Sequence, residues 1–142
     1  MDYKYTINNS NPEKKKNFIK NIFNSIAPTY DLLNRVLSLG TDKGWRKHAI
    51  SLTGINKIVL DICAGTGDLT RSLSKKHKNV FALDFSINML KTGIKKKWLI
   101  PNQAINGDAT KLPCKSNSFN YITIAFGIRN IPDLNNFFLE SN

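Results

Sequence analysis

Cysteines, acidic residues and long apolar runs are all scarce in this chain of 142 residues. The two cysteines, Cys63 and Cys114, are far apart in the sequence, which argues against both a paired metal site and a disulfide framework. No apolar run approaches the roughly 18 residues of a membrane-spanning helix, and the first residues are too polar for the core of a signal peptide. We therefore expect a cytoplasmic protein without a metal centre, whose contact with a membrane would be peripheral.

Basic residues outnumber acidic residues by 21 to 10, which gives a formal net charge of +11. A surplus of this size is typical of proteins that bind nucleic acid or an anionic membrane surface. Many of the lysines, however, stand in short runs that suit the solvated faces of helices: Lys14–Lys16, Lys75 with Lys76 and Lys78, and Lys95–Lys97. We therefore expect no nucleic-acid partner and leave an anionic membrane open as a partner.

The spacing of apolar residues divides the chain into two parts near residue 55. Before it, apolar side chains recur at helical spacing over residues 12–24, 30–38 and 42–52, and Gly40 is the predicted cap of the second helix. Beyond it, the predicted elements follow in this order: strand 57–62, helix 66–76, strand 79–84, helix 86–98 with Ser86 as cap, strand 104–106, strand 119–126, and a helix capped by Asp133. Alternation of this kind is typical of a parallel sheet. We predict an N-terminal helical segment, residues 1–55, and a Rossmann-like α/β domain, residues 56–142.

The sequence ends soon after the fourth predicted strand, where a sheet of this kind would normally continue. One edge of the strand at 119–126 would then be unprotected. We expect the chain to be a C-terminally truncated fragment of a larger α/β fold, with the last strands missing. The alternative is a small sheet whose open edge pairs with a second copy in a homo-oligomer.

A glycine turn follows the first predicted strand, in the segment Asp61-Ile62-Cys63-Ala64-Gly65-Thr66-Gly67-Asp68. Gly65 and Gly67 allow a sharp turn and bring backbone N–H groups close to a ligand. A dinucleotide site would have a third small residue where Thr70 stands, and a phosphate loop would end in Gly-Lys-Ser/Thr. Asp68 would also repel a pyrophosphate. The turn therefore favours a nucleoside-type cofactor without phosphates, such as S-adenosylmethionine.

Two further acids follow the next predicted strands. Asp84 ends the second strand and Asp108 follows the third, so both would lie at the carboxyl edge of a parallel sheet. Asp84 is placed to accept both hydroxyls of a ribose, and hydrogen bonds to a charged group contribute roughly 1.5–3 kcal/mol each. Asp108 would accept from an adenine amino group. The alternative for both residues is an ordinary acid at a strand end or in a turn.

Together these segments resemble the class I S-adenosylmethionine-dependent methyltransferases. Two others, Phe23–Asn34 and Ile124–Asn130, resemble more specifically the ubiquinone/menaquinone biosynthesis C-methyltransferase family, and the resemblance covers nearly everything from Phe23 onward. It implies methylation of a ring carbon of a polyprenylated quinol, with S-adenosylmethionine as cofactor and residues 1–55 on the substrate side. Cys63 departs from the superfamily pattern, which often has glycine there.

The resemblance also implies a set of site residues. Those implied for cofactor binding are Thr66, Asp84, Asp108 and Ala109, and the glycine turn adds Asp61, Gly65 and Gly67. We predict Arg129, Asn130 and Tyr30 as the catalytic residues. Arg129 cannot be the base because a guanidinium stays protonated, but it would stabilise a phenolate or orient a water that takes the proton. Asn130 would hold a ring oxygen, and Tyr30 would close over the site with Asp31.

Two other functions compete with this prediction. The first is an inactive truncated fragment. The second is a methyltransferase acting on another small molecule or on nucleic acid. Enzymes that methylate base amino groups usually carry an Asn/Asp-Pro-Pro-aromatic segment after the fourth strand, whereas residues 125–128 are Ala-Phe-Gly-Ile, so a nucleic-acid substrate is disfavoured.

Overall fold

A four-stranded parallel sheet forms the centre of the protein. The computed structural model describes residues 12–37 and 41–142, so the predicted cap at Gly40 lies outside the described residues. The sheet has the order β3-β2-β1-β4, with strands β1 (Ile58–Ile62), β2 (Asn79–Asp84), β3 (Ala104–Asn106) and β4 (Tyr121–Ile124). All of its paired neighbours are parallel. The predicted Rossmann-like α/β class is confirmed.

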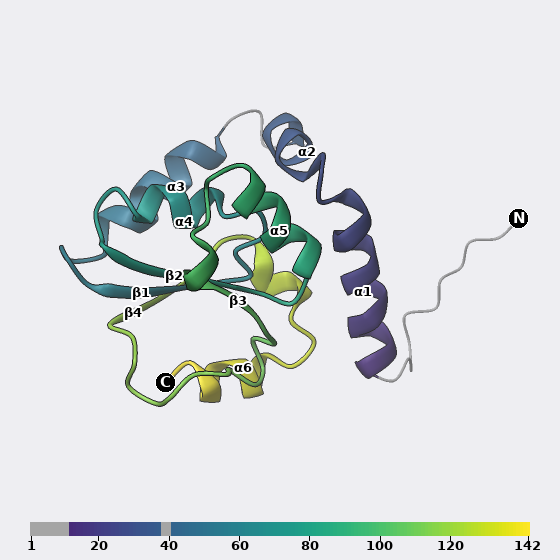
Figure 1. The fold of residues 1–142 in the computed structure, drawn as a ribbon. Coiled ribbons are helices and arrows are strands. Elements are labelled where there is room, and N and C mark those ends of the chain that lie inside the picture. The colour runs from purple at the N-terminus through teal and green to yellow at the C-terminus, as the bar shows by residue number, and fades with distance from the viewer. Residues whose placement is uncertain (1–11, 38–40) are drawn as a thin grey trace, which may run out of the picture.

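Helices cover both faces of this sheet (Figure 1). Helices α4 (Asp68–Leu73) and α5 (Ile87–Lys95) lie on one face with α3 (Asp42–Ser51), and α6 (Leu134–Glu140) lies on the other. Successive residues of a strand point to opposite faces. Accordingly Val59 of β1 packs with Leu69 and Leu73 of α4, whereas Leu60 packs with Phe137 of α6.

The remaining two helices precede the sheet. Helix α1 (Pro12–Ile26) runs alongside α5, and α2 (Tyr30–Leu37) follows it near one end of the sheet (Figure 1). The ring of Phe23 in α1 contacts both Tyr30 and Phe85, with centroids 5.8 Å and 6.1 Å away. This aromatic cluster holds the N-terminal helices close to the end of β2.

Two predicted helix caps are confirmed. The Ser86 hydroxyl accepts a hydrogen bond from the Met89 N–H at 3.2 Å, and the Asp133 carboxylate accepts one from the Asn136 N–H at 3.0 Å. The helix predicted from residue 66 begins only at Asp68, because Gly67 has a left-handed φ of 89° and cannot belong to it. The strand predicted over 119–126 is likewise shorter than expected, and it stops before Phe126, whose φ is 60°.

Strand β4 lies at one edge of the sheet, as the sequence predicts. Among the described residues it pairs with β1 alone. A groove of about 600 Å³ lies between β4 and α6, with Ile122, Ile124 and Phe137 among its lining residues.

The close packing of α5 against the glycine turn generates a first prediction. A Cβ at Gly93 would lie 2.4 Å from the Thr66 backbone oxygen, whereas one at Gly44 in α3 would meet nothing within 4 Å. We expect Gly93→Ala to lower the free energy of unfolding by about 1–3 kcal/mol through overpacking. The matched change Gly44→Ala should instead raise it, by up to about 1 kcal/mol, because alanine favours a helix. Denaturant unfolding of both variants checks this, and stabilisation by Gly93→Ala would contradict it.

Candidate functional site

The predicted site residues gather at the carboxyl ends of the strands, around two small cavities. We call them the β2–β3 cavity, of about 40 Å³, and the β1–β4 cavity, of about 30 Å³. Strand order reverses between β2 and β4 on either side of β1, so the β1–β4 cavity lies at a topological switch point, where ligands of open α/β sheets usually bind. Cys63, directly after β1, lines both cavities.

The cavities bring together most of the predicted site residues, but not all of them. Asp84, Asp108, Ala109 and Asn130 line the β2–β3 cavity, and Tyr30, Asp61 and Thr66 line the β1–β4 cavity. Gly65, Gly67 and Arg129 line neither.

The glycine turn has the backbone that its sequence predicts. Gly65 and Gly67 both have positive φ, of 59° and 89°. Cys63 also has a positive φ, of 55°, which costs an L-residue roughly 1–2 kcal/mol and explains why glycine suits this position. The open side of Gly67 is filled by Leu99, since a Cβ there would lie 2.2 Å from Leu99 Cδ2. The space beside Gly67 is therefore occupied by the Leu99 side chain and does not admit a ligand.

Asp84 joins the turn to the start of α5. One carboxylate oxygen accepts from the Gly65 N–H and the other from the Ser86 N–H, each at 2.8 Å. The residue is 4% exposed, and burial raises the pKa of its carboxyl to about 6 even though both hydrogen bonds lower it. A carboxylate offers about four acceptor positions, so Asp84 retains capacity for the two hydroxyls of a ribose.

Asp61 is buried more deeply and is held by two threonines. Its carboxylate accepts from the Thr70 hydroxyl at 2.6 Å and from the Thr123 hydroxyl at 3.0 Å, which links β1 to α4 and β4. Burial raises the pKa of this carboxyl to about 7, against the effect of the threonine bonds. Its contact with a cofactor stays a prediction.

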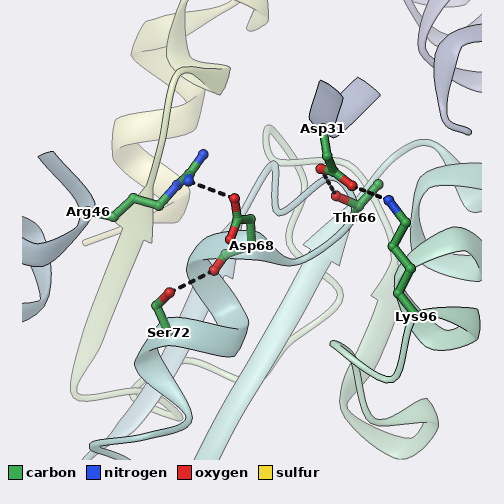
Figure 2. A network of polar contacts seen from close by, with 6 residues as sticks. All are labelled: Asp31, Arg46, Thr66, Asp68, Ser72 and Lys96. Carbon is green, nitrogen blue, oxygen red and sulfur yellow. Dashed lines mark hydrogen bonds and ion pairs between the residues drawn. The ribbon is translucent and has the colours of Figure 1, made fainter. Parts of the chain in front are cut away.

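All three N-terminal helices reach the loops at this edge through polar contacts that the sequence did not predict. Lys16 of α1 pairs with Asp108. Asp31 of α2 accepts from the Thr66 hydroxyl at 2.5 Å and pairs with Lys96, and Arg46 of α3 contacts Asp68 at 2.6 Å (Figure 2). The residues of these contacts are Lys16, Asp31, Arg46, Thr66, Asp68, Lys96 and Asp108.

Lys16 and Lys96 make contacts that the sequence analysis missed. Both were expected on solvated helix faces; Lys96 is exposed and Lys16 is half-buried, and each is also in an ion pair. Their partners lie 92 and 65 positions away in the chain, a separation at which no local pattern operates. Burial pushes the pKa of Asp108 upward, but the bonds from Lys16 and Thr110 outweigh it and hold this pKa below its usual range.

The predicted catalytic residues do not converge on one point in this structure. Tyr30 lines the β1–β4 cavity and Asn130 lines the β2–β3 cavity. Arg129 is exposed on the 3-10 helix η2 (Gly127–Asn130), which follows β4. The roles of these residues stay predictions.

The side chains around the two cavities fit an adenosyl group with an amino-acid tail. The β2–β3 cavity combines apolar Ile19, Leu83 and Ile131 with the carboxylates of Asp84 and Asp108, which suits a flat base and a ribose. The β1–β4 cavity is more polar and has charges of both signs. Each has room for only a few water molecules, so α1 and α2, which line them, would move outward to admit such a ligand.

Solved structures with a similar fold include methyltransferases that depend on S-adenosylmethionine. One, from Thermotoga maritima, is described as a possible histamine N-methyltransferase, with a TM-score of 0.70, 19% identity, and coverage of 85% of this chain and 54% of that one. Another is phosphoethanolamine N-methyltransferase 1 of Haemonchus contortus, crystallised with phosphoethanolamine and S-adenosylhomocysteine. It has a TM-score of 0.66 and 20% identity, over 84% of this chain and 27% of that one. The fold is that of a class I methyltransferase, a class that uses S-adenosylmethionine.

The chain belongs to the ubiE/COQ5 methyltransferase family, whose model matches residues 9–141. It is 42% identical over 127 residues to the demethylmenaquinone methyltransferase of Staphylococcus epidermidis, covering 85% of this chain and 53% of that protein. The enzyme of the same name from Staphylococcus aureus is also 42% identical, with coverage of 83% and 52%. The predicted family is confirmed, and the chain spans about half the length of these relatives.

The buried carboxyl of Asp61 generates a prediction about pH. Its pKa of about 7 in the folded chain lies above the ordinary value of 3.8, so between these values the folded state holds a proton that the unfolded state has lost. The contribution of Asp61 to stability is therefore lost as the pH rises through this window. Asp61→Asn cannot ionise and keeps a group that can bond both threonines. We expect the free energy of unfolding of the unaltered chain to fall relative to Asp61→Asn from about pH 4 to about pH 7.

Denaturant unfolding of both proteins at several pH values measures this difference. Other titrating groups, Asp84 included, are present in both proteins, so their contributions to the difference in unfolding free energy largely cancel. A stability difference that stayed constant over this range would show that the Asp61 pKa is not raised.

Proposed function

We propose that the chain carries the cofactor-binding part of an S-adenosylmethionine-dependent C-methyltransferase that acts on a polyprenylated quinol in ubiquinone or menaquinone biosynthesis. The observation that carries this proposal is the arrangement of Asp84, Asp108 and Thr66 beside two adjoining cavities at one sheet edge. The name demethylmenaquinone methyltransferase of the Staphylococcus relatives favours a naphthoquinol over a benzoquinol.

Each part of the cofactor has a candidate partner in this arrangement. Asp84 would accept the ribose hydroxyls, Asp108 would accept from the adenine amino group beside Ala109, and Thr66 would contact the amino-acid tail. When bound, S-adenosylmethionine supplies an electrophilic methyl group for a carbon nucleophile. The protein's main task is then to align the quinol ring, and positioning of this kind can supply roughly 7–11 kcal/mol.

The substrate-side residues follow from the same layout. Arg129 and Asn130 lie on η2, after β4, and would act on the ring oxygens, Arg129 by stabilising a phenolate and Asn130 by hydrogen bonding. Tyr30 would cover the reacting groups from α2. On that helix Leu33 and Val36 are 44% and 62% exposed, and they offer an apolar surface to a prenyl tail. Residues 1–55 would thus form the substrate side.

A prenylated substrate resides in a membrane, and one face of the chain suits contact with an anionic membrane. Leu32, Val36 and Trp45 are 66%, 62% and 57% exposed on α2 and α3. Between α3 and α4 lies a groove of about 460 Å³ with these basic residues in its lining: Lys43, Arg46, Lys47, Arg71 and Lys75. Exposed apolar groups and a basic patch are the two signals that peripheral binding requires. No helix in the described part of the chain is long and apolar enough to span a bilayer. We therefore propose a cytoplasmic protein bound peripherally through this face.

The role of Arg129 can be separated from cofactor binding. Label transfer from S-adenosylmethionine to a demethylated naphthoquinol should fall at least about tenfold in Arg129→Ala, because charge on the ring oxygen is left unstabilised. The affinity for S-adenosylhomocysteine, measured by calorimetry, should stay unchanged. Lys78→Ala, which removes a cation outside both the site and the membrane face, is the control and should keep full transfer. A variant that lost affinity but kept turnover would refute the assigned role.

The membrane face predicts a charge-dependent interaction. The chain should sediment with phosphatidylglycerol vesicles and not with phosphatidylcholine vesicles. Lys43→Glu combined with Lys47→Glu should weaken this binding at least about tenfold, since each basic residue near an anionic surface contributes about 1 kcal/mol. The pair Lys78→Glu and Lys115→Glu changes the net charge equally outside this face and serves as control. Equal losses in both double variants would mean that only the net charge matters.

A further inference from the structure

Two aromatic side chains, Trp45 of α3 and Phe126, lie together beside the β1–β4 cavity. Their ring centroids are 5.6 Å apart and the ring planes are tilted by 52°. Phe126 is one of the residues that line the cavity, and Trp45 and Phe126 are 57% and 37% exposed. Large exposed apolar groups at the edge of a cavity are typical of a site that takes an apolar ligand.

The backbone after β4 directs Phe126 to this place. Ile124 packs on the α6 side of the sheet with Leu60 and Phe137, and strand alternation would send residue 126 to the same side. Instead, Phe126 has a φ of 60° and its ring contacts Trp45 of α3, which lies on the other side of the sheet (Figure 1). A left-handed backbone is rare for a bulky residue, and such conformations cluster at functional sites.

The residue after Phe126 fixes this turn. Gly127 is buried, and a Cβ there would lie 2.3 Å from the Cβ of Cys63. The start of η2 therefore packs directly on the residue that follows β1. The position of the Phe126 ring is thus set by the backbone before a ligand binds, and this lowers the entropy cost of binding.

We propose that Trp45 and Phe126 form an aromatic slot that binds the ring of the quinol and favours the fused ring of a naphthoquinol. The proposal rests on the proposed function, because it presupposes a quinol substrate. A flat ring gains offset or edge-on contacts with aromatic side chains, and a fused ring offers more surface for them than a single ring. The β1–β4 cavity, of about 30 Å³, is too small for such a ring, so the ring lies against the exposed surfaces of the two side chains.

The place of the aromatic slot suits a substrate that comes from a membrane. Trp45 belongs to the exposed apolar face through which we propose membrane contact. Phe126 directly precedes η2, which carries Arg129, and it lines the same cavity as Tyr30. The slot therefore lies between the proposed membrane face and two of the predicted catalytic residues.

The competing occupant of the aromatic slot is the adenine of the cofactor, which is also flat. The carboxylates proposed to hold the adenosine, Asp84 and Asp108, line the β2–β3 cavity, whereas Phe126 lines the β1–β4 cavity. This separation favours the quinol over the adenine.

Calorimetry with two quinols tests the aromatic slot on the 142-residue chain saturated with S-adenosylhomocysteine. The quinols are 2-dimethylallyl-1,4-naphthoquinol and 2-dimethylallyl-1,4-benzoquinol, which carry the same short tail and are kept reduced under argon. In Trp45→Leu the affinity for the naphthoquinol should fall about 2- to 12-fold, the range for one lost aromatic pair. The affinity for the benzoquinol should fall less, and Trp45→Phe should restore most of the naphthoquinol affinity.

The matched control is Phe138→Leu in α6. Phe138 is 56% exposed and is also in a tilted aromatic pair, with its ring centroid 5.2 Å from that of Phe137, but it lines neither cavity. Its substitution should leave both quinol affinities unchanged. Every variant should bind S-adenosylhomocysteine as tightly as the unaltered chain.

The outcomes separate the aromatic slot from the proposed function. Equal losses in Trp45→Leu and Phe138→Leu would mean that the quinol binds any exposed aromatic surface, and a matching loss of S-adenosylhomocysteine affinity would assign the slot to the cofactor; either result would overturn the proposal. If Trp45→Leu does not melt cooperatively, Phe126→Leu gives the same test. Failure of the unaltered chain to bind either quinol would overturn the proposed function together with the slot, whereas quinol binding that ignores both substitutions would overturn the slot alone.

Discussion

Three of the loops in the site depend for their position on Asp84, at the end of β2. Its carboxylate accepts the N–H groups of Gly65 and Ser86, and its backbone carbonyl accepts from Gly107 N and from Asn106 Nδ2 at 3.1 Å and 2.9 Å. Gly65 follows β1 and Ser86 follows β2, whereas Asn106 is the last residue of β3 and Gly107 comes directly after it. One residue thus fixes the separation of three strand ends, and a β2–β3 cavity of defined shape results.

This arrangement has a cost in stability. Asp61 and Asp84 are both nearly inaccessible, and burial raises the pKa of each, so holding either as an anion near neutral pH is unfavourable. Cys63, two residues after Asp61, adds a backbone with a positive φ of 55°. The apolar residues that alternate along β1 offset these terms, because Val59 and Leu60 are fully buried on opposite faces. Unfavourable features concentrated at one edge of a sheet are typical of a functional site.

Local features of the sequence were predictable because their causes lie within a few residues. Ser86 and Asp133 cap helices by accepting a hydrogen bond from the N–H three residues later in the chain. The strand at 79–84 has its predicted bounds. The strand-end acids were also found, since a parallel sheet brings the carboxyl ends of its strands to one edge.

The contacts made by Lys16, Arg46 and Lys96 had no such local cause. A lysine in a basic run has the same sequence signature whether it is solvated or paired, and only the packing of α1 against α5 brings Lys16 to Asp108. The need for Gly93 was missed for a similar reason. Its neighbour, the Thr66 carbonyl, belongs to a turn that lies before β2 in the chain.

The N-terminal helices contact the very groups that the proposed cofactor would need. Lys16 is paired with Asp108, and Asp31 accepts a hydrogen bond from Thr66. A bound adenosyl ligand would therefore replace Lys16 at Asp108 and Asp31 at Thr66. The Lys16 and Asp108 side chains are each 30% exposed, and ion pairs of this kind contribute only about 0–1 kcal/mol. A ligand with micromolar affinity gains about 8 kcal/mol, far more than these contacts hold. The contacts that seat α1 and α2 are therefore weak enough for a ligand to displace, and Asp108 and Thr66 would then be available to it.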